Sequence, residues 1–516
     1  MLPEFKNEPY TDFSQADNQR DMKAALDAVS GQLGGEYELI IGGRKVKAAE
    51  QFNSINPSRK DQVVGVFQKA AAEQARQAME TALETFPSWS RVDPAERADV
   101  LFRAADAMRR RRMELNAWMI LEEGKNWLEA DADVAEAIDF LDFYGREMIR
   151  LAGEQPLTGV PGERNELVYI PLGMGVVIPP WNFPLAILTG MTSAALVAGN
   201  TVVLKPSSDS PAMGYQFMEI MEEVGLPPGV VNFVTGSGSA IGDTLVGHPR
   251  TRFISFTGSK AVGLGIVELA AKTAPGQIWI KRVIAEMGGK DAIIVDRETD
   301  LDRAAEGVKV AAFGFQGQKC SACSRAVVLE DVYDRFLELL VEKTGTITVG
   351  EVIDQKNYMG PVINQRAMDS IMEYIEIGRQ EGRLLTGGGP AGEGGFYIQP
   401  TIIADVDPQA RIAQEEIFGP VLAVIKARDF DHALEIANNT EYGLTGAVYS
   451  DDREKLDKAR RVFHCGNLYL NRKCTGALVG GHPFGGFNMS GTDSKAGGRD
   501  YLLLYTQAKS ISEYIG

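Results

Sequence analysis

The feature that most constrains this fold is a regular alternation of two kinds of segment, which begins near residue 167. Short β-branched runs, typical of strands buried on both faces, are separated by longer stretches with helical periodicity. The strand-like runs cover residues 175–178, 201–204, 230–234 and 252–256, and the helical stretches cover 210–224, 240–246 and 261–271. Such alternation predicts an α/β fold with a doubly wound parallel sheet. These sheets bind nucleotides beyond the carboxyl ends of their strands.

The rest of the chain is long enough for further domains. At 516 residues it exceeds the size of one simple core, so we expect two or three domains. Asp93 followed by Pro94 is a strong helix start, and this helix is predicted to run to about residue 123, where Gly124 ends it. The other expected elements are a helix around 20–29 in an N-terminal arm, an edge hairpin over 37–45, a helix over 129–148, a second α/β block over 285–487 and a strand over 501–505.

Charge and composition argue against several classes of function. The net charge of −17 disfavours binding to nucleic acid or to anionic membranes. The one dense basic cluster, residues 109–112, lies in a helical pattern and is predicted to be a solvated helix face or an intersubunit ion-pair network rather than a contact for an anion or nucleic acid. No run of about 20 apolar residues predicts a membrane helix. The chain start lacks the features of a signal peptide, and four cysteines are too few for a disulfide scaffold, so we expect a cytoplasmic protein.

A cysteine in a glycine-bearing turn is the first candidate for chemistry. Cys320 follows Gly317, and we expect a helical segment after it, whose N-terminus would lower the thiol pKa and favour the nucleophilic thiolate. The alternative for a single cysteine is a small buried hydrophobe. Cys320 and Cys323 also form a C-x-x-C pair, which is compatible with redox chemistry or half a zinc site. The spacing of Cys465 and Cys474 fits no common zinc motif.

Two further motifs could complete a catalytic site. Glu286 follows the apolar run 283–284 and precedes two glycines, so its carboxylate could reach a cleft as a general base toward water. The alternative is a capping or solvated glutamate. Asn182 lies among prolines that fix the backbone, and a fixed amide N–H is what an oxyanion requires. The alternative there is a proline-rich turn.

Nucleotide-binding features follow the predicted strands. Lys205 comes directly after a strand, where its ammonium could contact ribose hydroxyls. Ser259 follows another strand and opens a helix, whose free N–H groups could hold a pyrophosphate. The usual G-x-G-x-x-G is absent, and Gly236-Ser237-Gly238 is only a fragment of it.

Six motifs, taken in order, resemble the aldehyde dehydrogenase family over essentially the whole chain. They are Pro180-Trp181-Asn182, Lys205-Pro206, Phe256-Thr257-Gly258-Ser259, Glu286-Met287-Gly288-Gly289-Lys290, Gly317-Gln318-Lys319-Cys320 and Glu415-Glu416-Ile417-Phe418-Gly419-Pro420. The resemblance implies a Rossmann-like, doubly wound NAD(P)-binding domain (1–149 and 168–285), an α/β catalytic domain (286–487) and a small β oligomerisation flap (150–167 and 488–516). It also implies a homodimer or a higher homo-oligomer, formed when one subunit adds a strand to its neighbour's sheet.

The resemblance implies a role for each candidate residue. Cys320 would attack an aldehyde and form a thioester, Asn182 and the Cys320 N–H would hold the oxyanion, and Glu286 would activate the hydrolytic water. The residues implied to bind NAD are Trp181, Lys205, Ser208, Gly238, Ser259, Glu416 and Phe418. No metal is expected. A non-catalytic member of the family is the alternative.

A narrower resemblance is to the members that oxidise L-glutamate γ-semialdehyde to L-glutamate, the second step of proline breakdown. Glu123-Gly124-Lys125-Asn126, Phe315 to Ala322 and Asn471-Arg472-Lys473-Cys474-Thr475-Gly476-Ala477 carry it. The implied substrate-binding residues are Glu136 for the ammonium, Phe183 and Phe484 for the aliphatic part, and Ser321, Gly476 and Ala477 for the carboxylate. The alternatives are another semialdehyde such as succinate semialdehyde and, for Glu136, an exposed helical acid.

One position differs from a common family pattern. Many NAD-preferring members carry a glutamate three residues after the lysine, where this chain has Ser208. A carboxylate there accepts ribose hydroxyl bonds and repels a 2′-phosphate. We therefore expect NADP to be accepted alongside NAD.

Overall fold

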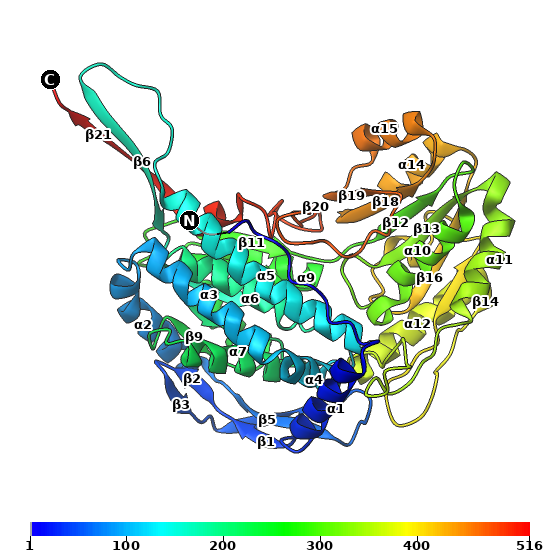
Figure 1. The fold of residues 1–516 in the computed structure, drawn as a ribbon, viewed down its shortest axis with the longest axis horizontal. Helices are drawn as coiled ribbons and strands as arrows, with labels where there is room; N and C mark the ends of the chain where they lie inside the picture. The colour runs from blue at the N-terminus through cyan, green and yellow to red at the C-terminus, as the bar shows by residue number, and fades with distance from the viewer. Residues whose placement is uncertain (1–2) are drawn as a thin grey trace.

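The alternation that begins near residue 167 forms a seven-stranded sheet in the computed structural model, which describes residues 3–516 (Figure 1). Its order is β11-β10-β7-β8-β9-β2-β3. The strands are β2 (Leu39–Ile41), β3 (Arg44–Val46), β7 (Met174–Ile178), β8 (Thr201–Leu204), β9 (Val231–Phe233), β10 (Phe253–Thr257) and β11 (Arg282–Glu286). The five strands from β7 to β11 are parallel, and the predicted hairpin β2–β3 closes one edge. Because the chain order reverses between β7 and β10, the sheet is doubly wound, as predicted.

Helices cover both faces of this sheet. Val176 and Val203 pack with α2 (Ala72–Trp89) and α8 (Gly238–Gly247) on one face. Val177 and Val202 pack into the helical layer on the other face. That layer contains α3 (Pro94–Arg110), α4 (Arg112–Glu122), α5 (Trp127–Ala152), α6 (Ala186–Val197) and α7 (Pro211–Glu223); α1 (Ala16–Ser30) packs on α4, and α9 (Lys260–Ala271) packs on β11. A three-stranded sheet, β1 (Gly35–Tyr37), β5 (Val63–Lys69) and β4 (Glu50–Ile55), completes this first unit.

The helix predicted to run from Pro94 to about residue 123 is wrong in one respect, because Arg111 interrupts it with φ −95° and ψ 11°. Because the helix is interrupted at Arg111, the arginines of the basic cluster point in different directions and pair with different acidic residues. Arg111 donates to Glu114 and contacts Glu219 of α7, while Arg112 pairs with Asp131 of α5 at 2.6 Å. These ion pairs lie within one subunit, so the cluster is a paired helix face, and an intersubunit network stays a prediction.

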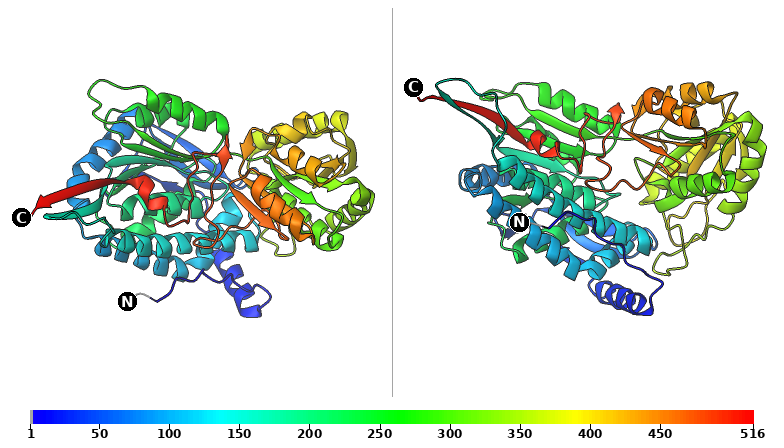
Figure 2. Two further views of the ribbon diagram at one scale, coloured as in Figure 1. Left: turned by 90° about the horizontal axis from the view of Figure 1, so that it is seen from above. Right: turned by 45° about the horizontal axis from the view of Figure 1, so that its top comes forward.

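A second seven-stranded sheet forms the second unit, with the order β14-β15-β16-β13-β12-β18-β19 (Figures 1 and 2). All neighbours are parallel except β14 and β15. The strands are β12 (Asp291–Val295), β13 (Cys323–Leu329), β14 (Arg383–Thr386), β15 (Thr401–Ala404), β16 (Val421–Ala427), β18 (Thr445–Tyr449) and β19 (Asn467–Leu470). The helices are α10 (Leu301–Phe313), α11 (Tyr333–Thr344), α12 (Gln365–Glu381), α13 (Arg411–Gln414), α14 (Phe430–Asn438) and α15 (Arg453–Val462), with short 3₁₀ turns η1 (Gly314–Gly317) and η2 (Glu330–Val332). Only residues 287–290 separate β11 of the first unit from β12 of the second.

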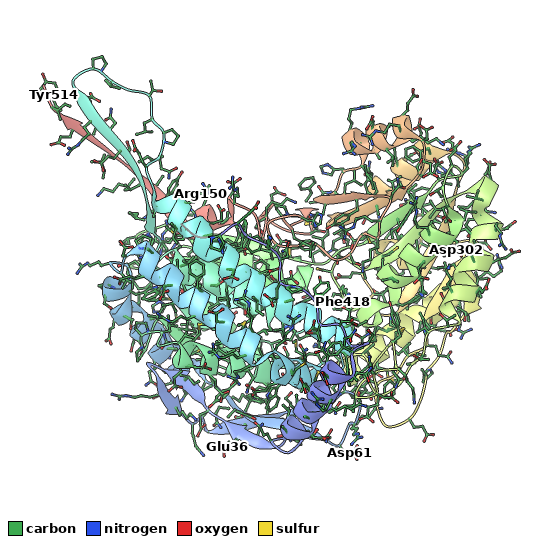
Figure 3. The ribbon with its side chains drawn as sticks, viewed as in Figure 1. Glu36, Asp61, Arg150, Asp302, Phe418 and Tyr514 are labelled. Carbon is green, nitrogen blue, oxygen red and sulfur yellow. The ribbon has the colours of Figure 1, made fainter. Side chains whose placement is uncertain are left out.

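A two-stranded antiparallel flap projects from the first unit. It pairs β6 (Glu163–Pro171) with β21 (Thr506–Tyr514), and the C-terminus lies at its tip, beyond the labelled Tyr514 (Figures 1 and 3). Every residue of β21 after Thr506 is exposed. A minor pair, β17 (Tyr442–Gly443) with β20 (Phe487–Asn488), lies near the second unit. Within residues 3–516, no helix has the length and apolar character needed to cross a membrane.

The strand predicted over residues 501–505 is wrong: this run is the 3₁₀ helix η3 (Tyr501–Tyr505). The helical turn brings two buried hydroxyls together, with the Tyr505 Oη donating to the Tyr501 Oη at 3.1 Å. Tyr501 also stacks on Tyr144, and the Tyr505 hydroxyl bonds to Ser255 at 2.7 Å. In a strand, residues four apart would lie about 13 Å from each other and could not share this network.

Candidate active site

The three candidate catalytic residues come from different elements of both units. Asn182 follows β7, Glu286 is the last residue of β11, and Cys320 lies between η1 and β13. The Asn182 Nδ2 donates to the carbonyl of Gln318 at 2.9 Å, two residues before the cysteine. The Glu286 carboxylate lies close enough to Cys320 to influence the pKa of its thiol. The fold therefore brings together the thiol, the carboxylate and the amide.

The turn that carries Cys320 is held in an unusual conformation. Phe315, Gln316 and Gly317 all have positive φ angles, of 49°, 57° and 67°. A Cβ on Gly317 would lie 2.3 Å from the carbonyl oxygen of Gly419, so only glycine fits there. The Gln316 Nε2 donates to the carbonyls of Gly124 at 3.1 Å and Pro361 at 2.7 Å. Strained backbone of this kind persists because its surroundings fix it.

The prediction that a helix follows Cys320 and lowers its pKa is wrong. A turn leads directly into β13, so the segment after Cys320 supplies no helix N-terminus to the sulfur in the described structure. Burial raises the pKa of the Cys320 thiol well above its usual value, and Asp291, Glu416 and Glu286 add to the effect. The free thiol is therefore protonated near neutral pH, and its attack on a substrate requires a proton acceptor.

Glu286 has the properties of such an acceptor. Its Oε1 accepts a hydrogen bond from the Ser494 hydroxyl, while its Oε2 is buried and has no partner among residues 3–516. Burial raises the pKa of Glu286 to about 8. A Cβ on either Gly485 or Gly491 would lie 3.1 Å from Oε1, so glycine backbone allows the close approach. A carboxyl group that titrates near neutral pH can exchange protons with a thiol or a water.

The carboxyl edge of the first sheet collects the residues implied to bind NAD. Trp181 follows β7, Lys205 and Ser208 follow β8, Gly238 opens α8, and Ser259 precedes α9. The Lys205 Nζ makes a single hydrogen bond, to the carbonyl of Pro206 at 3.0 Å, which leaves donors for a ligand. Burial lowers the pKa of Lys205 to about 8. The donors at this edge fit a dinucleotide.

Two residues of the second unit complete that edge. The Glu416 Oε1 accepts from the Gly289 N–H at 3.0 Å, and a Cβ on Gly288 would lie 2.1 Å from Oε2. The Phe418 ring meets the Trp181 ring edge-on, with centroids 5.6 Å apart. Figure 3 shows the labelled Phe418 between the two units.

The substrate-binding candidates come from several separate segments of the chain. Glu136 of α5 is half-buried, so it is not an exposed helical acid; burial raises its pKa to about 8, and Asp133 contributes. The Phe183 ring lies 4.2 Å from the Nζ of Lys125. Phe484 immediately precedes Gly485, beside Glu286, and bonds to Ala496 through its backbone.

The loop that contains Gly476 and Ala477 is joined to the catalytic turn. The Cys474 Sγ contacts the carbonyl of Ser321 at 3.4 Å. Within residues 3–516, neither the Gly476 N–H nor the Ala477 N–H donates to a protein acceptor. Two backbone donors are therefore free near Ser321.

Several polar residues of the site escape prediction from the sequence. Lys319 forms a bidentate ion pair with Glu129, at 2.7 Å to both oxygens, across 190 residues of chain. The buried Lys125 pairs with Asp133 at 2.6 Å. In the sequence, only the position of Lys319 beside Cys320 indicates a role in the site, and it does not reveal Glu129 as the partner.

The redox and metal alternatives find little structural support. Cys323 is buried, and its thiol faces the Arg325 carbonyl at 3.5 Å. All four cysteines are free thiols. Among residues 3–516, no three His, Cys, Asp or Glu side chains are grouped to hold a metal ion.

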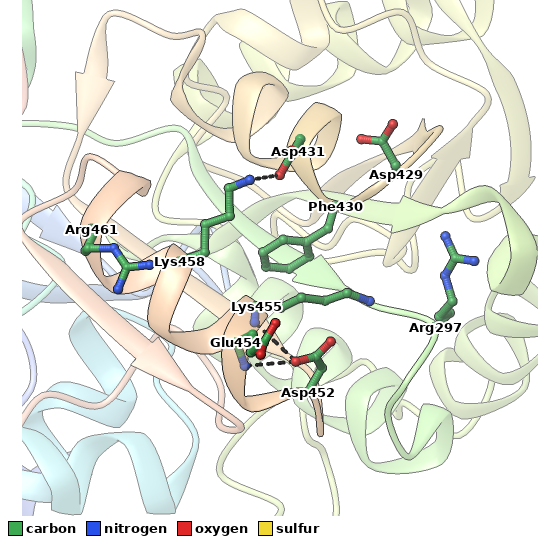
Figure 4. Close-up of a pocket in the computed structure, with 9 residues that line it drawn as sticks. All are labelled: Arg297, Asp429, Phe430, Asp431, Asp452, Glu454, Lys455, Lys458 and Arg461. Carbon is green, nitrogen blue, oxygen red and sulfur yellow. Dashed lines mark hydrogen bonds and ion pairs between the residues drawn. The ribbon is translucent and has the colours of Figure 1, made fainter.

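A separate pocket of about 520 Å³ lies on the second unit, away from the thiol (Figure 4). Several of its charged groups are paired within the protein: Lys458 pairs with Asp431, Lys455 pairs with Asp296, and Asp452 caps α15. This pocket offers no nucleophile, and we assign it no part in the chemistry.

Comparison with known proteins identifies the family. The family model described as "Aldehyde dehydrogenase family" matches residues 45–511. A 1-pyrroline-5-carboxylate dehydrogenase of Geobacillus thermodenitrificans is 61% identical over 513 residues, covering 99% of this chain and 100% of that protein. The solved 1-pyrroline-5-carboxylate dehydrogenase from Thermus with bound NAD has a TM-score of 0.98 and 50% identity, covering 99% of both chains. The solved proline utilization A from Bdellovibrio bacteriovorus, with a TM-score of 0.98 and 46% identity, matches 99% of this chain over 53% of its own. This chain belongs to the aldehyde dehydrogenase family.

Proposed function

We propose that this protein oxidises L-glutamate γ-semialdehyde, the open form of 1-pyrroline-5-carboxylate, to L-glutamate with NAD as the hydride acceptor. The observation that carries the proposal is the meeting of Cys320, Glu286 and Asn182 beside the carboxyl edge of a nucleotide-type sheet. Relatives that are 57–61% identical over the whole chain are named 1-pyrroline-5-carboxylate dehydrogenase.

The geometry supports a thioester mechanism. The Cys320 Sγ bonds to the aldehyde carbon, and its proton passes to the Glu286 carboxylate, which has a free Oε2. One N–H of the Asn182 amide is fixed on Gln318. The second N–H, and the Cys320 N–H, which has no partner among residues 3–516, remain to hold the oxyanion. NAD, when bound, supplies the acceptor for the hydride that leaves the same carbon.

Hydrolysis of the thioester completes the reaction. Glu286 first releases the thiol proton to solvent, and its ionised form then removes a proton from water. The water oxygen bonds to the acyl carbon, the C–S bond breaks, and the proton held by Glu286 passes to the departing sulfur. The products are a carboxylate and the regenerated thiol. Water addition after oxidation accounts for the second oxygen of glutamate.

The substrate is tested by comparing aldehydes. We expect kcat/KM for L-glutamate γ-semialdehyde to exceed that for succinate semialdehyde by at least about tenfold, because only the former has an ammonium group for Glu136. The measurement is NADH formation by the purified enzyme with each aldehyde. Equal or reversed kcat/KM values would favour an enzyme for another semialdehyde.

Cofactor choice provides a second prediction. We expect NADP to support initial rates within about a thousandfold of those with NAD, because Ser208 does not repel a 2′-phosphate. Ser208→Glu should lower kcat/KM with NADP by about tenfold or more and leave that with NAD within about twofold. Ser207→Glu, one residue earlier, is the matched control. Similar NADP kinetics in wild type and Ser208→Glu would show that this position does not face the ribose.

The assembly and the location complete the proposal. The flap presents nine residues of β21 paired only to β6, and a lone two-stranded ribbon is marginally stable, so we propose that it pairs with a second subunit in a homodimer or higher homo-oligomer. We also propose a cytoplasmic location, because the nucleophile must stay reduced. No nucleic-acid or membrane partner is proposed.

A further inference from the structure

Three lysines of the site lower the pKa of a single carboxyl group, that of Glu129. The Lys319 Nζ takes both oxygens of Glu129, at 2.7 Å each. Lys473 belongs to the same electrostatic cluster: burial would raise the pKa of Glu129, yet Lys319, Lys125 and Lys473 together hold it below its usual value. The Lys473 Nζ itself has no hydrogen bond or ion pair within residues 3–516, although the side chain is half-buried. One ammonium group therefore remains without a partner.

The position of Lys473 relates this ammonium to the nucleophile. The next residue, Cys474, contacts the Ser321 carbonyl at 3.4 Å, and Ser321 adjoins Cys320. A Cβ built on Gly476 would lie 3.7 Å from the Lys473 Cε, so the lysine stem runs beside the free N–H groups of this loop. The Lys473 side chain, with its unpaired ammonium, therefore lies beside the N–H groups of Gly476 and Ala477.

The neighbouring Arg472 cannot take the same role. Its Nη2 donates to the carbonyls of Thr475 at 3.0 Å and Gly476 at 2.9 Å. Its guanidinium also lies over the Tyr469 ring, 4.5 Å from the centroid. Arg472 therefore stabilises the loop conformation, and Lys473 is the cation of this loop that can bind a ligand.

A carboxyl group that can take the opposite charge lies on α5. Glu136 is half-buried near Asp133, with no hydrogen bond or ion pair within residues 3–516. A bound ammonium would favour the ionised form of Glu136, so Lys473 and Glu136 suit the carboxylate and the ammonium of an amino acid respectively. We propose that Lys473 is a specificity-determining residue that binds the α-carboxylate of the substrate. This inference rests on the proposed function.

The electrostatic environment of Lys473 also favours binding of a carboxylate. Burial lowers the pKa of Lys473, and Lys319 adds to this, so the ammonium is destabilised in the free protein. A bound carboxylate supplies the missing counter-charge. A charge-assisted hydrogen bond of this kind contributes about 1.5–3 kcal/mol, equivalent to about 10- to 150-fold in affinity.

The test compares a charged and an uncharged aldehyde in the same variants. We expect Lys473→Met to lower kcat/KM for L-glutamate γ-semialdehyde by about 10- to 150-fold, mainly through KM, and to leave that for hexanal within about twofold. Lys473→Arg should restore most of the loss. Lys356→Met, which removes an exposed lysine paired with Asp354, is the control and should change neither value. Inhibition by L-glutamate should weaken in Lys473→Met by the same factor.

Each alternative result has a distinct meaning. An equal fall with both aldehydes would assign Lys473 a structural role and overturn the inference, as would unchanged kcat/KM and glutamate inhibition. If the wild type prefers succinate semialdehyde, the proposed substrate is wrong. The role of Lys473 is then tested by the ratio of kcat/KM for succinate semialdehyde to kcat/KM for butanal in the same variants. The experiment thus distinguishes a wrong substrate assignment from a wrong role for Lys473.

Discussion

Cys320→Ala should abolish dehydrogenase activity, with kcat reduced by at least about 10⁴-fold. Cys320 carries the thiol that lies near both Asn182 and Glu286, and without this thiol no thioester can form. NAD binding should persist, because the donors that fit the cofactor lie at the edge of the first sheet. Steady-state NADH formation measures the first effect, and titration calorimetry with NAD measures the second.

Cys323→Ala is the matched control, since it removes a thiol only three residues away. Cys323 is buried at the start of β13 and faces the Arg325 carbonyl, so it has no access to a substrate. We expect this variant to keep most of the wild-type activity. Complete loss in Cys323→Ala would contradict a one-thiol mechanism and would revive the redox explanation of the C-x-x-C pair.

Glu286→Gln should separate the two halves of the reaction. The amide cannot take a proton from water, so thioester hydrolysis should slow by about 10²- to 10⁴-fold. If another base accepts the thiol proton, rapid mixing will show a burst of NADH of about one equivalent per site, followed by slow turnover. Glu415→Gln, which alters an exposed acid paired with Arg411, is the control. A variant with normal turnover would exclude Glu286 as the base.

The pH profile gives an independent check on the same residue. Burial raises the pKa of Glu286 to about 8, so the carboxyl group is mostly protonated below that value and ionised above it. Because the ionised form acts as the base, the wild-type kcat for hydrolysis should rise as the pH passes through about 8. The residual activity of Glu286→Gln should lack this rise. If the variant kept the same limb, another group would be responsible for it.

Local sequence patterns predicted much of the fold because they depend on near neighbours. The strands at 175–178 and 201–204 and the helix start at Asp93 follow from periodicity and capping, and the structure has them at nearly the same residues. The failures have a different cause. The break at Arg111 is set by acids on α5 and α7, and the 501–505 turn is set by Tyr144 and Ser255, which lie far away in the sequence.

The candidate site shows the same division. Motifs identified the Cys320, Glu286 and Asn182 positions, but no pattern could indicate that Ser494 would bond to Glu286 across 208 residues, or that Glu129 would neutralise Lys319. The electrostatic setting of the thiol was missed for this reason. The chain after Cys320 enters β13 because 323–329 pairs with strands on both sides, which local propensity does not reveal.

The two hydrogen bonds of Gln316 make the position of the Cys320 thiol depend on how the two units pack against each other. One bond reaches Gly124 in the first unit and the other reaches Pro361 in the second. A slight tilt between the halves stretches one of these bonds and shifts the sulfur atom before either core loosens. We therefore expect heat or a remote destabilising substitution to misplace the Cys320 thiol while most of the chain is still folded.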